Sequence, residues 1–361
     1  MAGTVGIAGA GSIAFGVAAF LEDAGMAAML WSPSGKGTAA LAAGTPLTAT
    51  KAVEGTFNPA VAASAQELAA AADIIVIALP AYGHKAVFDA LAPHLAARHT
   101  VLISSHASFG ALYLSRLLAA RGLVIPIVAW GTTAVTGRKT GPAEVMVNTV
   151  RAKIDIATVP RSRADAGRAA CEQLFGERFV ERDSLMAIAV SNLNPQNHMG
   201  IALCNMTRME HGESWGQGAN VTPNVGRLLE ALDAERIAIA DALGVSVRNI
   251  FQHFHLSFHV PEASISDMNQ EMHREGRGGM GPSTADSRYV TEDVPYGLVP
   301  TARLGALVGR PAPIHAAGIT IFSSLYGRDF IAENNLMPAL DFETLSLEDI
   351  TTLARDGYRA T

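Results

Sequence analysis

Short, fully apolar runs alternate with helical stretches through the first half of the chain. The apolar runs predict strands at 5–8, 28–31, 74–79, 101–104 and 124–130. The segments between them predict helices at 12–24, 65–72, 85–97 and 110–120. Strands that are apolar at every position are typical of a parallel sheet covered by helices on both faces. With right-handed crossovers, this pattern predicts an α/β fold that begins with a Rossmann-type doubly wound sheet.

The pattern changes near residue 182. Two extended stretches at 145–150 and 153–159 are expected to pair as a hairpin at the sheet edge, before a helix at 161–175. Long segments with apolar residues at helical spacing then follow, at 185–208, 224–243 and 245–259. We therefore expect a dinucleotide-binding domain at 1–182 and a mostly α-helical substrate and catalytic domain at 183–361. The segment 274–282 contains four glycines and is expected to be a mobile loop.

The composition excludes several classes of protein. A chain of 361 residues with 49% hydrophobic residues can bury a sizeable core without disulfide or metal cross-links. Its two cysteines fit a reducing compartment, and a net charge of -6 argues against nucleic acid or an anionic membrane as the main partner. No apolar run reaches the length of a membrane span, and the first residues lack a basic leader. A soluble, cytoplasmic protein is expected.

A glycine-rich turn stands between the first predicted strand and the first helix. Gly9, Gly11 and Ala14 form the G-x-G-x-x-A variant of the dinucleotide fingerprint. The first glycine permits the tight turn, the second lets the backbone approach a pyrophosphate, and the alanine allows close packing of helix and strand. Ser12 and Ile13 complete the motif at the helix N-terminus, where free amide groups favour an anion. Because the motif lies in a strand-turn-helix context, it predicts a dinucleotide cofactor.

The end of the second predicted strand indicates which dinucleotide is bound. A carboxylate there would bind the ribose hydroxyls of NAD(H), but 31–38 contains no acidic residue. Ser32, Ser34 and Lys36 instead offer hydroxyl groups and a positive charge, which a 2′-phosphate requires. The sequence therefore favours NADP(H) over NAD(H). The alternative is that Ser-Pro-Ser-Gly forms an ordinary turn.

Three further positions lie where the rest of the cofactor or the substrate is expected. Leu79 and Pro80 follow a strand at the carboxyl edge of the sheet, where the ribose and nicotinamide should run. Thr133 follows the strand at 124–130 and is a candidate substrate contact, with an ordinary loop as the alternative. Trp215 is a candidate for lining an amine pocket, with a place in the core as the alternative.

A polar motif opens the helical half of the chain. Asn194 followed by Pro195 is typical of a helix start, with Asn194 as the N-cap and Pro195 as the first helical residue. His198 is then expected in the first turn of the new helix. Because a helix N-terminus disfavours a protonated imidazole, His198 needs a carboxylate partner there. The segment 288–298, Arg-Tyr-Val-Thr-Glu-Asp-Val-Pro-Tyr-Gly-Leu, supplies candidates.

With these motifs the sequence resembles the opine dehydrogenases, the family that includes the octopine and nopaline dehydrogenases. The resemblance spans most of the chain and rests on the glycine-rich turn, the Asn-Pro-x-x-His element and the long segment at 288–298. Members reductively condense an α-keto acid with the amine of an amino acid, using NADH or NADPH. The resemblance implies that His198 and Asp293 form the catalytic pair. It also implies that Arg288 contacts the cofactor and takes part in domain closure.

These residue types suit such chemistry. Reduction of a C=N or C=O bond needs a proton at the heteroatom, and histidine can supply it because its pKa lies near neutrality. Asp293 would fix the tautomer of His198 and stabilise its protonated form, and Arg288 would attract a phosphate or carboxylate. Without the resemblance, a histidine at a helix start, such as His198, is more often structural than catalytic. Asp293 can then be a turn residue and Arg288 a surface residue. Glu292 is a rival carboxylate.

Three histidines at 253, 255 and 259 have a spacing that resembles a metal site. On a helix, however, His253 and His255 point about 200° apart, and no cysteine or carboxylate nearby completes a tetrahedron. We therefore expect no metal, and a place for these histidines on a helix surface or in a pocket lining.

The sequence is consistent with three functions. The first is an NADP(H)-dependent oxidoreductase of the opine dehydrogenase type, acting on CH–NH or C=N bonds in a cleft between the two domains. The second is a keto-acid or hydroxy-acid reductase without an amine partner, and the third is a dinucleotide sensor without turnover. The expected partners are a small α-keto acid and an amine or amino acid, with neither nucleic acid nor membrane. Helical domains of this kind often form homodimers, although no interface feature is evident in the sequence.

Overall fold

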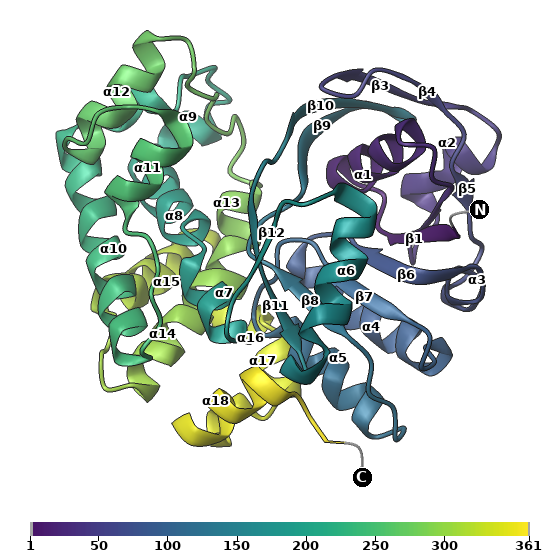
Figure 1. Ribbon diagram of the computed structural model, residues 1–361. Helices are drawn as coiled ribbons and strands as arrows, with labels where there is room; N and C mark the ends of the chain where they lie inside the picture. The colour runs from purple at the N-terminus through teal and green to yellow at the C-terminus, as the bar shows by residue number, and fades with distance from the viewer. Residues whose placement is uncertain (1–2, 360–361) are drawn as a thin grey trace. The chain divides into compact units, whose positions relative to one another are not determined.

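The computed structural model describes residues 3–359, which divide into two compact units (Figure 1). The first unit contains the described residues up to Ile188 together with those from Ala339 on, and the second contains Ala189–Pro338.

A mixed eight-stranded sheet forms the centre of the first unit. Its strand order is β12-β11-β8-β7-β6-β1-β2-β5, and every neighbouring pair is parallel except β8 and β11. The strands are β1 (Thr4–Ala8), β2 (Ala28–Trp31), β5 (Ala60–Val61), β6 (Ala72–Ile77), β7 (Thr100–Ile103), β8 (Ile127–Trp130), β11 (Ile154–Val159) and β12 (Phe179–Glu181). The helices that connect them are α1 (Ser12–Asp23), α2 (Ala39–Ala42), α3 (Ala65–Ala71), α4 (His84–Leu91), α5 (Gly110–Ala119) and α6 (Ala164–Phe175). The predicted doubly wound sheet is confirmed, and its strand order reverses between β1 and β6.

A second sheet, which the sequence pattern did not predict, packs on α1. Its order is β4-β3-β10-β9, with β3 (Leu47–Lys51), β4 (Gly55–Phe57), β9 (Val135–Gly141) and β10 (Glu144–Val150). The expected hairpin of 145–150 with 153–159 is therefore wrong: β10 pairs with β9 and β3, while β11 joins the main sheet beside β8. The physical reason lies in α1, which is buried on nearly all sides and needs an apolar cover opposite the main sheet. Val135, Val145 and Val147 belong to that cover.

The described residues from Ala339 on belong to the first unit, whereas the expected helical domain runs to residue 361. Arg116 on α5 forms an ion pair with Asp341 (2.7 Å) and donates to the carbonyl of Ala339 (2.8 Å). Phe342 stacks on Phe109 with ring centroids 5.5 Å apart. The segment carries α18 (Leu347–Asp356), which lies against β11. This segment was expected in the helical domain only because it follows residue 182, and no periodicity assigned a helix to it.

The second unit is built from helices. They are α8 (Asn194–Cys204), α9 (Met206–Glu210), α10 (Pro223–Ala242), α11 (Ile250–Phe258), α12 (Ile265–Arg274), α13 (Arg288–Thr291), α14 (Val299–Leu307), α15 (Pro313–Tyr326) and α16 (Phe330–Glu333), with α7 (Leu185–Ser191) and α17 (Leu336–Ala339) at its two ends. The apolar segment 185–208 is thus three helices rather than one. Before α8 the helical ladder stops, and the Asn192 side chain accepts from the Asn194 amide (3.0 Å). No helix in the described part of the chain is long and apolar enough to cross a membrane.

A buried ionic network holds four of these helices together. Asp233 on α10 accepts hydrogen bonds from Gln196 on α8 (2.8 Å), from Arg236 (2.7 Å) and from the amide of Ile250 on α11 (2.7 Å). Arg236, only 2% exposed, also donates to the carbonyl of Val190 on α7 (2.6 Å). Because each buried charge has its partners, the hydrogen bonds and ionic attraction offset the free-energy cost of removing these charges from water. The network also fixes where α8 begins.

We predict that Asp233→Ala destabilises the second unit by about 3–5 kcal/mol, because it leaves the Arg236 guanidinium buried without its counter-charge. Urea unfolding followed by circular dichroism measures the change. The exposed ion pair of Arg208 and Glu213 gives the control, since Glu213→Ala should cost less than about 1 kcal/mol. The double variant Asp233→Leu with Arg236→Met should regain most of the lost stability. Equal losses for Asp233→Ala and Glu213→Ala would contradict the prediction.

Candidate functional site

The turn between β1 and α1 accepts only glycine at its first position. Gly9 has φ +144°, and a Cβ atom built on it would lie 2.2 Å from the carbonyl oxygen of Ala78 and 3.2 Å from the Cβ of Ala14. Strand β1, the residue after β6 and the first turn of α1 therefore meet at one point. This close approach is the geometry expected of the dinucleotide fingerprint.

The second glycine of the motif borders open space. A Cβ on Gly11 would meet no atom within 4 Å, so the backbone is bare in front of the α1 N-terminus. Ser12 and Ile13 begin the helix, and its first turn contains no acidic residue. Free amide groups, the positive end of the helix dipole and the absence of acid suit a phosphate. The residues present therefore fit a dinucleotide.

The segment after β2 is both a turn and a cluster of polar groups. The amide of Gly35, which has φ +66°, donates to the carbonyl of Ser32 (3.0 Å), so the turn expected as the alternative is formed. The Oγ atom of Ser32 is nevertheless buried without a hydrogen-bond partner. Ser34 and Lys36 are exposed. A buried hydroxyl and, four residues later, an exposed ammonium group suit a bound anion, whereas 31–38 contains no carboxylate to bind ribose hydroxyls.

Two buried histidines lie at the carboxyl edge of the main sheet, and sequence reasoning gave them no role. His84 follows Leu79 and Pro80, and its Nε2 atom lies 3.1 Å from the Leu79 carbonyl, while its Nδ1 has no partner. Both ring nitrogens of His106, after β7, also lack partners. Burial lowers the pKa of His84 to about 4, and burial together with the charge of His84 lowers the pKa of His106 to about 3. Both rings are neutral at pH 7.

The loop that carries His106 has a strained backbone. Ser105, Ser108 and Phe109 have φ values of 61°, 47° and 55°, in the left-handed region that non-glycine residues seldom adopt. The hydroxyl of Ser104, at the start of the loop, is buried without a partner. Strain and unpaired polar atoms together are typical of a ligand-binding segment.

In the second unit the structure brings together the two residues that the resemblance implied. His198 Nδ1 lies 2.7 Å from Asp293 Oδ2, and the two side chains are 20% and 18% exposed. Asn194 is the first residue of α8, with Leu193 as its N-cap, so His198 lies in the second turn rather than the first. The residues following Asp293 form a π-helical turn, Val294–Leu298.

Direct packing between the two motifs sets this distance. A Cβ on Gly297 in the π-helical turn would lie 2.3 Å from Pro195 Cγ, so only glycine allows the turn to rest on the start of α8. The proline of one motif and the glycine of the other therefore touch, and the carboxylate of Asp293 reaches the histidine one turn further along α8.

An aromatic ring that sequence reasoning missed fixes the plane of the imidazole. Tyr289 stacks on His198 with centroids 3.6 Å apart and ring planes at 9°. Its hydroxyl donates to Gln217 Oε1 (2.7 Å), and burial and the charge of Asp293 raise the pKa of Tyr289 to about 12. Stacking and the bond to Nδ1 leave Nε2 as the atom of His198 for proton exchange. The side-chain oxygen of the neighbouring Asn197 is buried without a partner.

The remaining predicted residues lie in different settings. Arg288 pairs through Nε with Glu292, so the rival carboxylate contacts the arginine while Asp293 contacts the histidine. Thr133 lies in the turn between β8 and β9 and is partly exposed. Trp215 is 3% exposed, and its Nε1 donates to the Pro282 carbonyl (3.1 Å). Its ring also packs against Gly281. Gly281 and Pro282 both belong to 274–282, the segment expected to be mobile.

The three histidines near residue 255 have separate surroundings. His255 Nδ1 lies 2.8 Å from the Val260 carbonyl, and His253 contacts the rings of Phe254 and Phe258. Among residues 3–359 no group of three or more histidine, cysteine or acidic side chains is placed to hold a metal ion.

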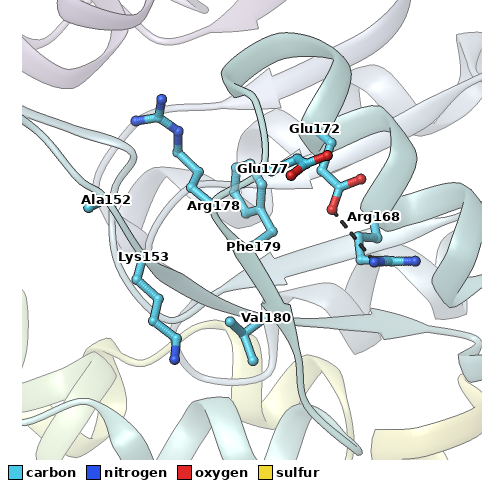
Figure 2. Close-up of a pocket in the computed structure, with 8 residues that line it drawn as sticks. All are labelled: Ala152, Lys153, Arg168, Glu172, Glu177, Arg178, Phe179 and Val180. Carbon is cyan, nitrogen blue, oxygen red and sulfur yellow. Dashed lines mark ion pairs between the residues drawn. The ribbon is translucent and has the colours of Figure 1, made fainter.

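A pocket of about 500 Å³ on the first unit contains none of the predicted site residues (Figure 2). Its lining is Ala152, Lys153, Arg168, Glu172, Glu177, Arg178, Phe179 and Val180. Charges of both signs gather there, and Arg168 and Glu172 face each other at 3.7 Å while Lys153 and Arg178 point apart (Figure 2). We regard it as a solvated surface hollow beside β12 and not as the functional site.

Comparisons with known proteins support the two-part organisation. Residues 181–326 match the family model described as NAD/NADP octopine/nopaline dehydrogenase, alpha-helical domain, and residues 5–160 match the model of Ketopantoate reductase PanE/ApbA. An opine dehydrogenase from Arthrobacter sp. (strain 1C) is 31% identical over 285 residues, which are 77% of this chain and 78% of that protein.

Solved structures show the same fold. Octopine dehydrogenase with NADH and L-arginine matches with a TM-score of 0.77 at 16% identity, over 99% of both chains. The same enzyme has been solved with NADH and agmatine and with NADH and pyruvate. Yersinopine dehydrogenase with NADP⁺ matches with a TM-score of 0.73 at 15% identity, over 95% of this chain and 99% of that one.

The buried histidines predict how stability depends on pH. Their folded-state pKa values lie below the unfolded value near 6.5, so the unfolded chain binds more protons and stability falls as the pH drops from about 6.5 toward 4. At pH 5 each histidine should cost about 2 kcal/mol relative to pH 7. Urea unfolding at the two pH values measures this loss.

His106→Leu should reduce the loss at pH 5 by about 2 kcal/mol, which is its half of the loss due to the two histidines, because leucine cannot bind a proton in the unfolded chain. The matched control is His94→Leu, at an exposed histidine of the same unit, which should leave the pH dependence as it is. The same loss at pH 5 in the unaltered chain and in His106→Leu would contradict the assignment.

Proposed function

Because the chain belongs to the opine dehydrogenase family, we propose that it reductively condenses an α-keto acid with the amine of an amino acid, using NADPH. The family makes it an oxidoreductase that acts on CH–NH bonds with a nicotinamide dinucleotide. The observation that carries the proposal is the bond of 2.7 Å between His198 and Asp293, each from a separate motif. The pyruvate, L-arginine and agmatine in the octopine dehydrogenase structures support a keto acid and an amine as the two substrates.

His198 acts as the general acid and base. Asp293 accepts a hydrogen bond from Nδ1–H of His198, which fixes the tautomer and stabilises the imidazolium when Nε2 takes a proton from the amine. In the reductive direction Nε2 takes a proton from the amine nitrogen as that nitrogen bonds to the keto carbon, and gives it to the hydroxyl group that leaves as water when the C=N bond forms. Tyr289 holds the ring plane, so the Nε2 direction varies little.

Residues of the first unit hold the cofactor, which supplies a hydride to the substrate carbon when bound. Gly9, Gly11, Ser12, Ile13 and Ala14 form the phosphate turn. At the carboxyl edge of the sheet, Leu79 and Pro80 border the ribose and nicotinamide. The assignment of Arg288 to the cofactor, and of Thr133 and Trp215 to the substrate, remains part of the proposal.

The choice of NADP(H) rests on the segment after β2. Ser32, with its unpartnered buried hydroxyl, Ser34 and the exposed Lys36 supply donors and positive charge for a 2′-phosphate. The lack of an acidic residue in 31–38 removes the repulsion that would oppose that phosphate.

One alternative has an observation of its own. The match of residues 5–160 to the ketopantoate reductase model favours a reductase that acts on a keto acid alone. The second unit favours the opine reaction instead, because its own match is to the octopine and nopaline dehydrogenase domain.

The deciding experiment is NADPH oxidation with pyruvate, with and without a pool of amino acids and amines, repeated with NADH. Oxidation that requires both substrates supports the proposal, and separating the pool then identifies the amine. Oxidation with pyruvate alone favours the reductase. Binding of NADPH without turnover on any keto acid and amine mixture favours a sensor.

We predict that His198→Ala lowers turnover at least 100-fold, because general acid–base catalysis is worth about 10²–10⁴-fold. Asp293→Asn should also lower turnover, since it keeps the shape but removes the charge that stabilises the imidazolium. His211→Ala, at an exposed histidine of the same unit, is the control and should retain activity. A rate near that of the unaltered enzyme for His198→Ala would remove this residue from the chemistry.

Lys36→Glu should weaken NADPH binding far more than NADH binding, because it places a negative charge beside the 2′-phosphate. Dissociation constants from nicotinamide fluorescence measure both. Arg163→Glu makes the same charge change at an exposed residue just after β11, which runs antiparallel to β8, so it lies away from the carboxyl edge. It should leave both constants unchanged, and an equal effect of Lys36→Glu on the two cofactors would refute the assignment.

A further inference from the structure

Lys139 on β9 brings a positive charge to the glycine turn from a distant part of the sequence. Its Nζ atom lies 3.1 Å from the carbonyl oxygen of Gly37 and 3.4 Å from that of Ala10. Gly37 belongs to the segment after β2 and Ala10 to the turn after β1. One ammonium group therefore contacts both the turn after β1 and the segment after β2, the two segments against which a dinucleotide is expected to bind.

Close packing of the second sheet on α1 makes this reach possible. A Cβ on Gly16 in α1 would lie 3.0 Å from Val135 Cγ2, so a larger residue would push β9 away from the helix. Figure 1 shows β9 and β10 running beside α1. The amide of Lys139 donates to Ser12 Oγ (2.8 Å), which fixes the strand to the first residue of α1.

Among residues 3–359, no carboxylate lies within ion-pair distance of Lys139. Its polar side-chain contacts there are the two carbonyl groups. The ammonium also lies 4.0 Å from the centre of the Phe15 ring. Partial burial lowers the pKa of Lys139, so its charged form loses hydration that no carboxylate restores. An ammonium group has three donors, and two carbonyls leave one for a ligand.

The surroundings specify an anion and its position. Ser12 accepts from the Lys139 amide and still has its own hydroxyl hydrogen to donate, at a helix start without acidic residues. A Cβ on Gly37 would lie 2.5 Å from the Cβ of Ala10, so the two segments meet on the ribose side of the turn. In this fold the segment after the second strand reads the adenosine ribose, and the ammonium group contacts that segment at Gly37.

We propose that Lys139 binds the 2′-phosphate of NADP(H), together with Lys36 and Ser32, and so helps to determine cofactor specificity. The inference rests on the proposed preference for NADP(H). It adds a residue from the second sheet to a site that the fold otherwise builds from the loops after β1 and β2.

The test compares direct binding of NADPH and NADH, without substrate, to the unaltered enzyme and to Lys139→Met. Methionine keeps much of the apolar stem over Phe15 but removes the charge. We expect NADPH to bind roughly 10-fold to 100-fold more weakly, as for loss of a charged hydrogen bond, and NADH to change less than about 3-fold. Nicotinamide fluorescence gives both dissociation constants.

The neighbouring residue offers a matched control. Arg138 is exposed, and because side chains alternate along a strand it points away from the face that carries Lys139. Arg138→Met removes the same charge and should change neither constant more than about 2-fold. Lys139→Gln serves as a second variant should the methionine variant fail to fold, with circular dichroism as the check.

The outcomes separate the two proposals. If the unaltered enzyme binds NADH at least as tightly as NADPH, the proposed cofactor preference fails, and the inference fails with it. If it prefers NADPH but Lys139→Met weakens both cofactors equally, or neither, the preference stands and the role of Lys139 is overturned. A loss confined to NADPH supports the inference.

Discussion

The second unit depends on keeping one carboxylate buried. Asp233 accepts hydrogen bonds from α8, α10 and the start of α11, and its partner Arg236 reaches the end of α7. A buried charge restricts the positions of its neighbours, because any movement that breaks one of its hydrogen bonds leaves an unpaired polar group in an apolar core. Gln196 is part of this network and lies two residues before His198. The position of the proposed catalytic histidine is therefore set by electrostatics at the base of α8 as well as by packing.

Glycine makes the close contacts on which both halves of the proposed site depend. In the first unit, Gly9 lets the Ala78 carbonyl occupy the space of a side chain, which brings β1, β6 and α1 together. In the second, Gly297 lets the π-helical turn rest on Pro195, which brings Asp293 to His198. Each contact joins segments that are far apart in the sequence. Glycine thus allows a tight strand–helix turn in one unit and the contact of His198 with Asp293 in the other.

The sequence predicts what is local and misses what depends on packing between distant segments. The doubly wound sheet and its glycine turn follow from apolar runs and spacing, because a parallel sheet buries every position of its strands. The second sheet was missed because its strands are partly polar and its cover of α1 is visible only in three dimensions, so that only the stretch at 145–150 was expected to be extended. For the same reason Lys139, on that sheet, gave no signal. Nothing in Arg-Tyr-x-x-Glu-Asp shows that Tyr289 stacks on His198 or that Asp293, rather than Glu292, contacts it.

Buried polar side chains that have all their hydrogen-bond partners within the protein differ from those that lack a partner and are candidates for binding a ligand. The structural carboxylate Asp233 has all its partners inside the unit. By contrast, five of the eight unpartnered buried side-chain atoms in the described part of the chain belong to Ser32, His84, Ser104 and His106, which follow neighbouring or nearby strands at the carboxyl edge of the main sheet. Leaving a buried polar group unpaired costs about 1–3 kcal/mol, so a folded chain retains several at one edge only where something else satisfies them. The Nε2–H of neutral His84 faces the Leu79 carbonyl, so its Nδ1 atom lacks a donor, whereas the hydroxyl groups of Ser32 and Ser104 can use an acceptor. A nicotinamide dinucleotide carries groups of both kinds.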